Sequence, residues 1–175
     1  MIGVFICMPF VRRRIQDNMN SNYTEELDIP NVINENFRTG ENIIYDSEVE
    51  NDLRDVLGSG VVDIKATLGE ETDEMYRENG MDIYTFGMIT VAVNQEEVIQ
   101  DILIDYTVGE NKKEYGIYGI AGISDADAVK TILGTPDQEY EKELCYRFDR
   151  EFGLGLNINF SDDGMVEQLE YYYVQ

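Results

Sequence analysis

The spacing of apolar residues predicts two short helices in this chain. Between Ser124 and Leu133, apolar side chains recur every three or four positions, and they therefore share one side of a helix: Ala126, Val129, Ile132 and Leu133. Ser124 is the predicted N-cap, and Gly134 ends the helix. The stretch from Ser59 to Leu68 has the same pattern and ends at Gly69. A third helix is expected over Ser47–Leu57, and it would form a helical hairpin with the helix that starts at Ser59.

Alternation of apolar and polar residues predicts strands after each of these two helices. They are expected over 81–86, 89–93, 99–107, 144–148, 155–160 and 166–174. Alternation of this kind gives each sheet one face buried under the helices and one open face. Between Val166 and Leu169, and again between Ile99 and Ile102, the alternation breaks, which predicts a β-bulge at both places.

The helix and the final hairpin occur twice in the same order. The helices are offset by 65 residues (124 − 59) and the hairpins by 67 (156 − 89). We therefore expect an α+β fold of two tandem repeats, each a helix or helical hairpin packed on an antiparallel β-sheet. The predicted repeats are 43–109 and 110–175.

The segment before the first repeat has a different composition. Residues 1–11 are almost continuously apolar and are followed by three arginines, so 1–15 is predicted to be a truncated membrane-anchor remnant. The alternative is a short strand or helix that packs on the domain. Residues 16–42 are polar and lack periodicity, which is typical of a linker or arm.

Charge and missing residue types exclude several functions. With 36 acidic and 13 basic residues the net charge is −23, which disfavours binding to nucleic acid. The chain has no histidine, so mechanisms that need a histidine base are excluded. Ser161–Gly164 is predicted to be a hairpin turn and not a cation site, because Gly supplies the positive φ that such turns need. We expect no cofactor, no metal site and no catalytic residue.

The open face of the predicted sheets is the candidate partner-binding site. Tyr171 and Tyr173 are assigned to the core, which sends Tyr172 to the opposite face. Exposed tyrosine is a common anchor at protein interfaces. The candidate residues are Leu103, Asp105, Asn157, Asn159, Glu170 and Tyr172.

Two segments resemble a known group of bacterial domains. Ile123–Asp137, ending in Leu-Gly-Thr-Pro-Asp, and Phe160–Val166 are similar to the helix-to-strand signature and last hairpin of SmpA/OmlA and β-lactamase-inhibitor-protein-like (BLIP-like) domains. The resemblance covers about 47–174 in two copies, although the first copy has Glu70-Glu71 in place of Thr-Pro. No β-lactamase-contacting residue carries over. The resemblance implies a non-catalytic protein-binding module outside the cytoplasm, often tethered to the envelope.

The sequence therefore predicts a monomeric, non-enzymatic interaction module of a bacterial cell-envelope or secreted protein. Its partner is an unidentified protein, and the N-terminus is a candidate membrane tether. Localisation is expected to be extracytoplasmic, membrane-anchored or secreted, with a cytoplasmic protein as the alternative. Two other functions stay open: a cation-binding acidic surface protein, and a hydrolase that uses paired carboxylates.

Overall fold

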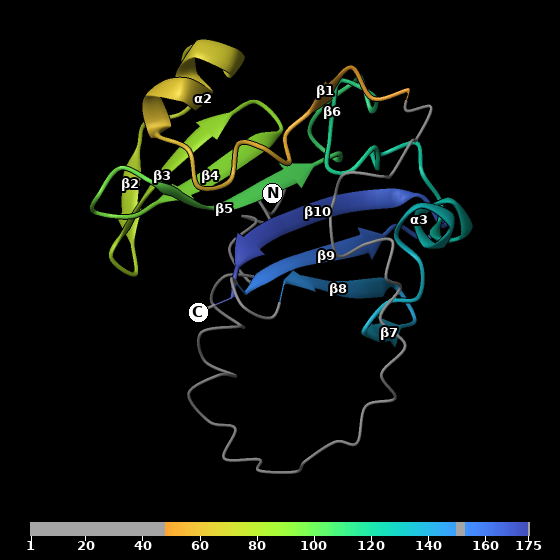
Figure 1. Ribbon diagram of the computed structural model, residues 1–175. Coiled ribbons are helices and arrows are strands. Elements are labelled where there is room, and N and C mark those ends of the chain that lie inside the picture. Colours follow the sequence, from red (N-terminus) through yellow and green to blue (C-terminus); the bar gives the residue numbers. More distant parts are fainter. Residues whose placement is uncertain (1–47, 150–152, 175) are drawn as a thin grey trace, which may run out of the picture. The chain divides into compact units, whose positions relative to one another are not determined.

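The structure is mostly β. The computed structural model describes residues 48–149 and 153–174 of the chain (Figure 1). Strands make up 45% of the described residues and helices 13%, with two short helices. The predicted segments 1–15 and 16–42 lie outside the described residues.

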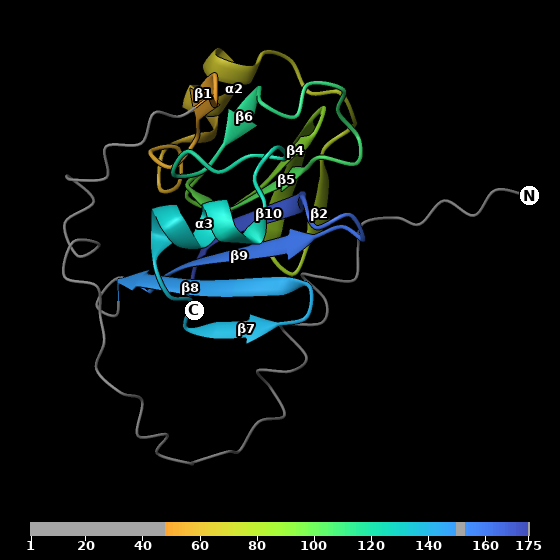
Figure 2. The ribbon, with the colours of Figure 1, turned by 90° about the vertical axis from the view of Figure 1, so that its right-hand side faces the viewer.

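One antiparallel sheet of eight strands forms the body of the described region. Its order is β2-β3-β4-β5-β10-β9-β8-β7, and Figure 2 shows β7, β8, β9 and β10 following one another from one edge. The strands are β2 (Tyr76–Glu78), β3 (Met81–Phe86), β4 (Ile89–Val93), β5 (Ile99–Asp105), β7 (Gln138–Tyr140), β8 (Glu143–Asp149), β9 (Leu154–Phe160) and β10 (Val166–Tyr173). β5 and β10 pair at the centre and join the two halves of the chain.

This sheet corrects the predicted fold class. We expected an α+β protein of two tandem helix-on-sheet repeats, and the structure is instead a mostly β protein with one continuous sheet. Apolar alternation defines the faces of a strand but does not say which strands pair, so the β5–β10 pairing was not visible in the sequence. The boundary predicted between 109 and 110 falls in the loop after β5.

The predicted helix over Ser47–Leu57 is also wrong. Residues 51–52 form β1 (Asn51–Asp52), which pairs in parallel with β6 (Tyr115–Gly116), and turns follow up to Gly58. The backbone N–H of Asn51 donates to Glu114 and that of Leu53 to Gly116. These tertiary bonds outweigh a short helix, which has little stability of its own without packing.

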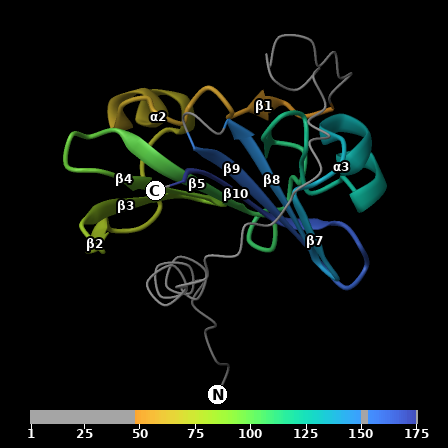
Figure 3. The same ribbon diagram turned by 60° about the horizontal axis from the view of Figure 1, so that its bottom comes forward.

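The other two helices form as predicted, slightly shorter at their starts. They are α2 (Val61–Leu68) and α3 (Ala126–Leu133), and they lie on the same side of the sheet (Figure 3). Asp125 and not Ser124 caps α3, since its carboxylate accepts from Ala128 N at 2.8 Å. The Ser124 hydroxyl instead accepts from the backbone N–H of Ala121.

The apolar core lies between the helices and one face of the sheet. Ile64 of α2 and Val129 of α3 are fully buried there. The sheet contributes fully buried side chains from four central strands: Ile89, Val91, Ile102, Ile104, Leu156, Ile158 and Leu169. These residues define the face of the sheet that is turned toward the helices. The residues between them along each strand lie on the opposite face.

Both predicted bulges are present. β10 has an extra residue between Val166 and Gln168 opposite β9, and β5 has one between Ile99 and Asp101 opposite β4. The turn at Ser161–Gly164 is confirmed as well, with Gly164 at φ 81°.

Candidate functional site

Strand register places the candidate residues on one face of the sheet, opposite the helices. Directly opposed residues of neighbouring strands point to the same side, so pairing can be followed across the sheet in three rows. The first is Tyr76, Ile83, Ala92, Asp101, Tyr172, Gly155 and Arg147. The second is Thr85, Thr90, Leu103, Glu170, Asn157, Cys145 and Gln138. The third is Asp105, Gln168, Asn159, Glu143 and Tyr140.

We call these three rows the polar face. All six residues singled out in the sequence lie on it, on the adjacent strands β5, β10 and β9: Leu103, Asp105, Asn157, Asn159, Glu170 and Tyr172. They are neighbours because β5 pairs with β10. Their role in binding a partner stays a prediction.

The centre of the polar face is not open, which corrects the expectation for two candidates. Asn157 is fully buried and Glu170 is 5% exposed. The Asn157 amide donates to the Glu170 carboxylate at 2.9 Å, and the Tyr172 hydroxyl lies 3.4 Å from the amide oxygen of Asn157. A buried carboxylate needs such a bond because burial removes its water. Asn157 and Glu170 are therefore buried and bonded to each other, and are not open as expected.

Tyr172 lies across the backbone of the neighbouring strand. A Cβ added to Gly155 would lie 2.6 Å from Cζ of the Tyr172 ring, which is closer than non-bonded carbons approach. Only glycine leaves room for the ring at this position. Tyr172 is consequently half-buried and has a fixed place on the face.

The other candidates are half-buried, and Asp105 has several bonds. Its carboxylate accepts from the Gln168 amide at 3.1 Å and from the backbone N–H and hydroxyl of Thr107 at 2.9 and 2.6 Å. Leu103 and Asn159 are also half-buried. Many polar side chains on the central strands are thus already hydrogen-bonded within the protein.

The most exposed aromatic side chains of the polar face are at its margins. Tyr76 on β2 is 40% exposed and Tyr140 on β7 is 56% exposed. Sequence reasoning missed both, because each lies in a strand of three residues that was taken for a polar connection. Alternation cannot be recognised over so few positions.

The polar face is acidic. Its three rows contain the carboxylates Asp101, Asp105, Glu143 and Glu170 and one basic side chain, Arg147. This agrees in sign with the net charge of −23 for the chain. A positively charged partner is attracted to such a face and a polyanion is repelled.

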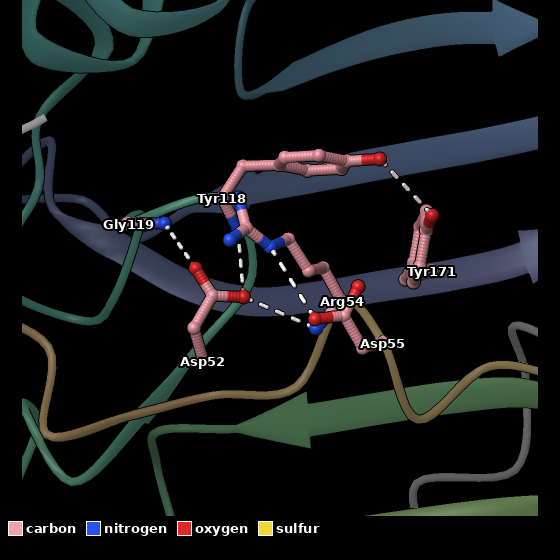
Figure 4. Close-up of polar contacts among 6 residues, drawn as sticks. All are labelled: Asp52, Arg54, Asp55, Tyr118, Gly119 and Tyr171. Carbon is pink, nitrogen blue, oxygen red and sulfur yellow. Dashed lines mark hydrogen bonds and ion pairs between the residues drawn. The ribbon is translucent and has the colours of Figure 1, made fainter. Parts of the chain in front are cut away.

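A second polar cluster lies on the opposite, helix-bearing side of the sheet (Figure 4). The Asp52 carboxylate accepts from the backbone N–H groups of Gly119, Arg54 and Tyr118, at 2.9, 3.1 and 3.2 Å. Tyr118 has a φ of 53°, which costs energy for a residue with a side chain. The bonds from Asp52 hold the 118–119 turn in this conformation.

The Tyr118 side chain connects that turn to the sheet. Its hydroxyl lies 3.1 Å from that of Tyr171 on β10, and its ring packs 4.9 Å from the ring of Phe148 on β8. Burial raises the pKa of the Tyr118 and Tyr171 hydroxyls, so both stay protonated at neutral pH. The cluster anchors the β1–β6 segment on the sheet, and we assign it a structural role.

The described residues offer little for a metal ion. Within 48–149 and 153–174, no group of three or more Cys, Asp or Glu side chains is arranged to hold one. Across the same ranges, no helix has the length and apolar composition needed to cross a membrane.

The comparisons with known proteins give a fold but no family. No protein-family model and no curated protein sequence matches the chain. Among solved structures it is similar to a cysteine-rich secretory protein from Staphylococcus aureus, with a TM-score of 0.52 and 10% identity over 73% of this chain and 48% of that one. It is also similar to an extracellular protein containing a SCP domain from Bacillus anthracis, with a TM-score of 0.50 and 8% identity over 71% and 46%.

A third solved structure, a DUF4309 family protein from Bacillus subtilis, matches with a TM-score of 0.43 and 18% identity over 66% of this chain and 79% of that one. The chain spans about half the length of the first two structures. At 8% and 10% identity, the likeness to these first two structures shows the fold alone. The resemblance to SmpA/OmlA and BLIP-like domains stays a prediction, since none of these three structures carries those names.

Proposed function

We propose that this chain is a non-catalytic protein-binding module of a bacterial envelope or secreted protein, and that it binds a basic partner through the polar face. The observation that carries the proposal is the placement of two exposed tyrosines, Tyr76 and Tyr140, at the margins of one continuous acidic sheet face. Tyrosine is enriched among the residues that dominate binding energy at interfaces.

The charge of the face favours a basic protein surface as the occupant. Asp101, Asp105 and Glu143 lie between or beside the two tyrosines in the register of the sheet. Complementary charge speeds association and suppresses wrong partners, while aromatic anchors supply most of the affinity. Tyrosines at the two ends and carboxylates between them match a partner with apolar pockets separated by lysine or arginine.

Extracytoplasmic placement, either membrane-anchored or secreted, is part of the same proposal. It is supported by the names of two structural neighbours, one an extracellular protein and one a cysteine-rich secretory protein. The absence of histidine agrees with a role that needs no general base at neutral pH.

The test is site-specific photo-crosslinking followed by affinity measurement. A benzophenone amino acid is placed at Tyr140 and, as the control, at Val62, which is 71% exposed on α2. Extracts of the source organism's envelope and medium then supply candidate partners, and the captured protein is purified. We expect a crosslink at Tyr140 and none at Val62.

Binding to the purified partner decides the outcome. The Y76A/Y140A double variant is expected to lose at least about tenfold in affinity, since tyrosine anchors commonly contribute more than about 1 kcal/mol each. V62A should bind like the unmodified chain, and 0.5 M salt should weaken binding. Equal crosslinking at both positions, or an unchanged affinity of the double variant, would refute the proposal.

A further inference from the structure

A cavity of about 410 Å³ opens beside the turn that joins β3 and β4, and none of the residues that line it belongs to the polar face. It is open to solvent, and three segments border it: the chain after α2, the β3–β4 turn and the β5–β6 loop. Its walls are formed by Leu68, Glu70, Thr72, Phe86, Gly87, Met88, Val108, Gly109, Glu110, Asn111, Glu114 and Tyr115. Its volume is within the range of small-molecule sites, roughly 300–1,000 Å³.

One part of the wall is apolar. Phe86 and Met88 belong to the core, at 6% and 8% exposed, and Val108 is 66% exposed at the rim. A Cβ added to Gly109 would lie 2.0 Å from the Met88 methyl carbon, so glycine is required for Met88 to hold its place. The wall can therefore cover an aliphatic chain.

The other part of the wall is acidic. Glu70 and Glu110 are exposed, and Glu114 is half-buried beside Tyr115. Burial, and then the hydrogen bond to Glu114, raise the pKa of the Tyr115 hydroxyl. No lysine or arginine is among the residues that form the wall.

Two of the basic residues that flank the wall in sequence form ion pairs of their own. Lys65 pairs with Glu71, and Lys113 pairs with Glu48. The hydrogen bond to Glu71 is the main cause that raises the pKa of Lys65, and Glu70 of the wall contributes to the same shift. With three glutamates and no lysine or arginine among its lining residues, the wall itself carries negative charge, and a bound cation would be stabilised there.

Hydrogen bonds fix the walls in place. The backbone N–H of Thr72 donates to Thr85 at 2.9 Å, and the N–H of Gly87 donates to the Thr72 hydroxyl at 3.0 Å. On the other side, the Asn51 amide donates to the backbone carbonyl of Glu114 at 3.0 Å. The cavity is therefore preformed, which lowers the entropic cost of binding.

We propose that this cavity binds an organic cation with an aliphatic body, that is, an alkylguanidinium or alkylammonium group. The aliphatic chain would lie on Phe86, Met88 and Val108, and the charged head would lie between Glu70 and Glu110. Arginine and lysine side chains divide in the same way between an apolar stem and a charged head. The same chemistry is found in free aliphatic amines and in a partner's side chain. The proposal does not depend on binding at the polar face.

The test uses three small probes that separate charge from apolar surface. Butylguanidine carries both, guanidinium ion carries only the charge, and butanol carries only the apolar chain. Each is titrated into the ¹⁵N-labelled full chain at about 0.15 M salt, so that long-range attraction to the acidic protein is screened. We expect saturable shifts with butylguanidine at 68–72, 86–88 and 108–115, and weaker or no saturation with the other two.

Charge-matched variants identify the carboxylates. E70Q/E110Q should weaken butylguanidine binding at least about fivefold, because two ion pairs are lost. E96Q/E141Q removes the same charge from two exposed turns of the sheet and should leave binding unchanged. All four positions are exposed, so the fold is expected to survive in both variants.

The source of the cation is resolved by a second ligand, the peptide acetyl-Gly-Arg-Gly-amide. Binding of the peptide at the same residues indicates a partner's side chain, and binding of butylguanidine alone indicates a free amine or guanidine. Either result supports the site. Equal weakening by both double variants, or no saturable shift at the cavity with either ligand, would overturn it.

Discussion

The contact between Gly155 and Tyr172 can be tested by adding a single methyl group. Gly155 has a φ outside the left-handed region, so alanine fits its backbone without strain. The new Cβ would lie 2.6 Å from Cζ and 2.7 Å from the hydroxyl oxygen of Tyr172. Because carbon atoms in contact are normally about 3.5–4.0 Å apart, the ring has to leave its place over β9.

The size of the effect follows from two opposing terms. Where alanine fits, replacing glycine stabilises a protein by about 0.4–1 kcal/mol by restricting the unfolded chain. Overpacking costs about 1–3 kcal/mol, so Gly155→Ala alone should destabilise by roughly 1–2 kcal/mol. In a Tyr172→Ala background the obstacle is gone, and the same change should become neutral or stabilising. The two substitutions should therefore be coupled by about 1–3 kcal/mol.

Urea unfolding of the four proteins, followed by far-UV circular dichroism, measures this coupling. Gly60→Ala is the control, because its added Cβ would meet its nearest neighbour, an Asp63 carboxylate oxygen, at an ordinary 3.6 Å. Additive effects of Gly155→Ala and Tyr172→Ala, within about 0.5 kcal/mol, would show that the ring does not lie on Gly155 in solution.

Three further changes test other contacts. Asp52→Ala removes the acceptor for the 118–119 turn and should cost about 2–4 kcal/mol in the free energy of unfolding, measured in urea. The hydrogen bond from Arg77 holds the pKa of Asp82 below its ordinary 3.8, so this pair stabilises the fold at neutral pH and loses that contribution as the pH falls through the lowered pKa. Arg77→Gln should return the pKa of Asp82 toward 3.8 in an NMR titration, and an unchanged pKa would contradict the assignment. Gly109→Ala places a methyl against the neighbouring methionine and should lower the melting temperature by several degrees in calorimetry, whereas an unchanged value would mean that the loop yields freely.

Six of the eight strands of the sheet were predicted with little error because they obey a local rule, and β2 and β7 were missed because three residues are too few to show it. Apolar residues on alternate positions fixed 81–86 and 89–93 at the bounds of β3 and β4, and the breaks in alternation marked both bulges. The same rule assigned Tyr172 and its neighbours to the face opposite the core. Each of these features depends on a few adjacent residues and needs no knowledge of distant contacts.

Features that depend on distant contacts were missed. Residues 51–53 form bonds to 114–116, more than 60 positions away, and these replace the helix that the local pattern favours. The β5–β10 pairing likewise joins segments about 65 positions apart. In each case the backbone N–H and C=O groups would also be satisfied in the alternative arrangement, a local helix for 51–53 or another strand pairing for β5 and β10. The spacing of apolar residues therefore does not distinguish the observed arrangement from the alternative.

The division of the polar face between centre and margin decides where a partner can gain binding energy. Separating Asn157 from Glu170 would leave a buried carboxylate without its amide donor, which costs more than a new surface contact returns. A partner should therefore leave that pair intact and gain affinity where exposed aromatic area is still available, at Tyr76 and Tyr140. Substitutions at the central candidates then act mainly on stability. Substitutions at the two marginal tyrosines should act mainly on binding, with a smaller change in the melting temperature, because 40% of the surface of Tyr76 and 56% of that of Tyr140 stays exposed.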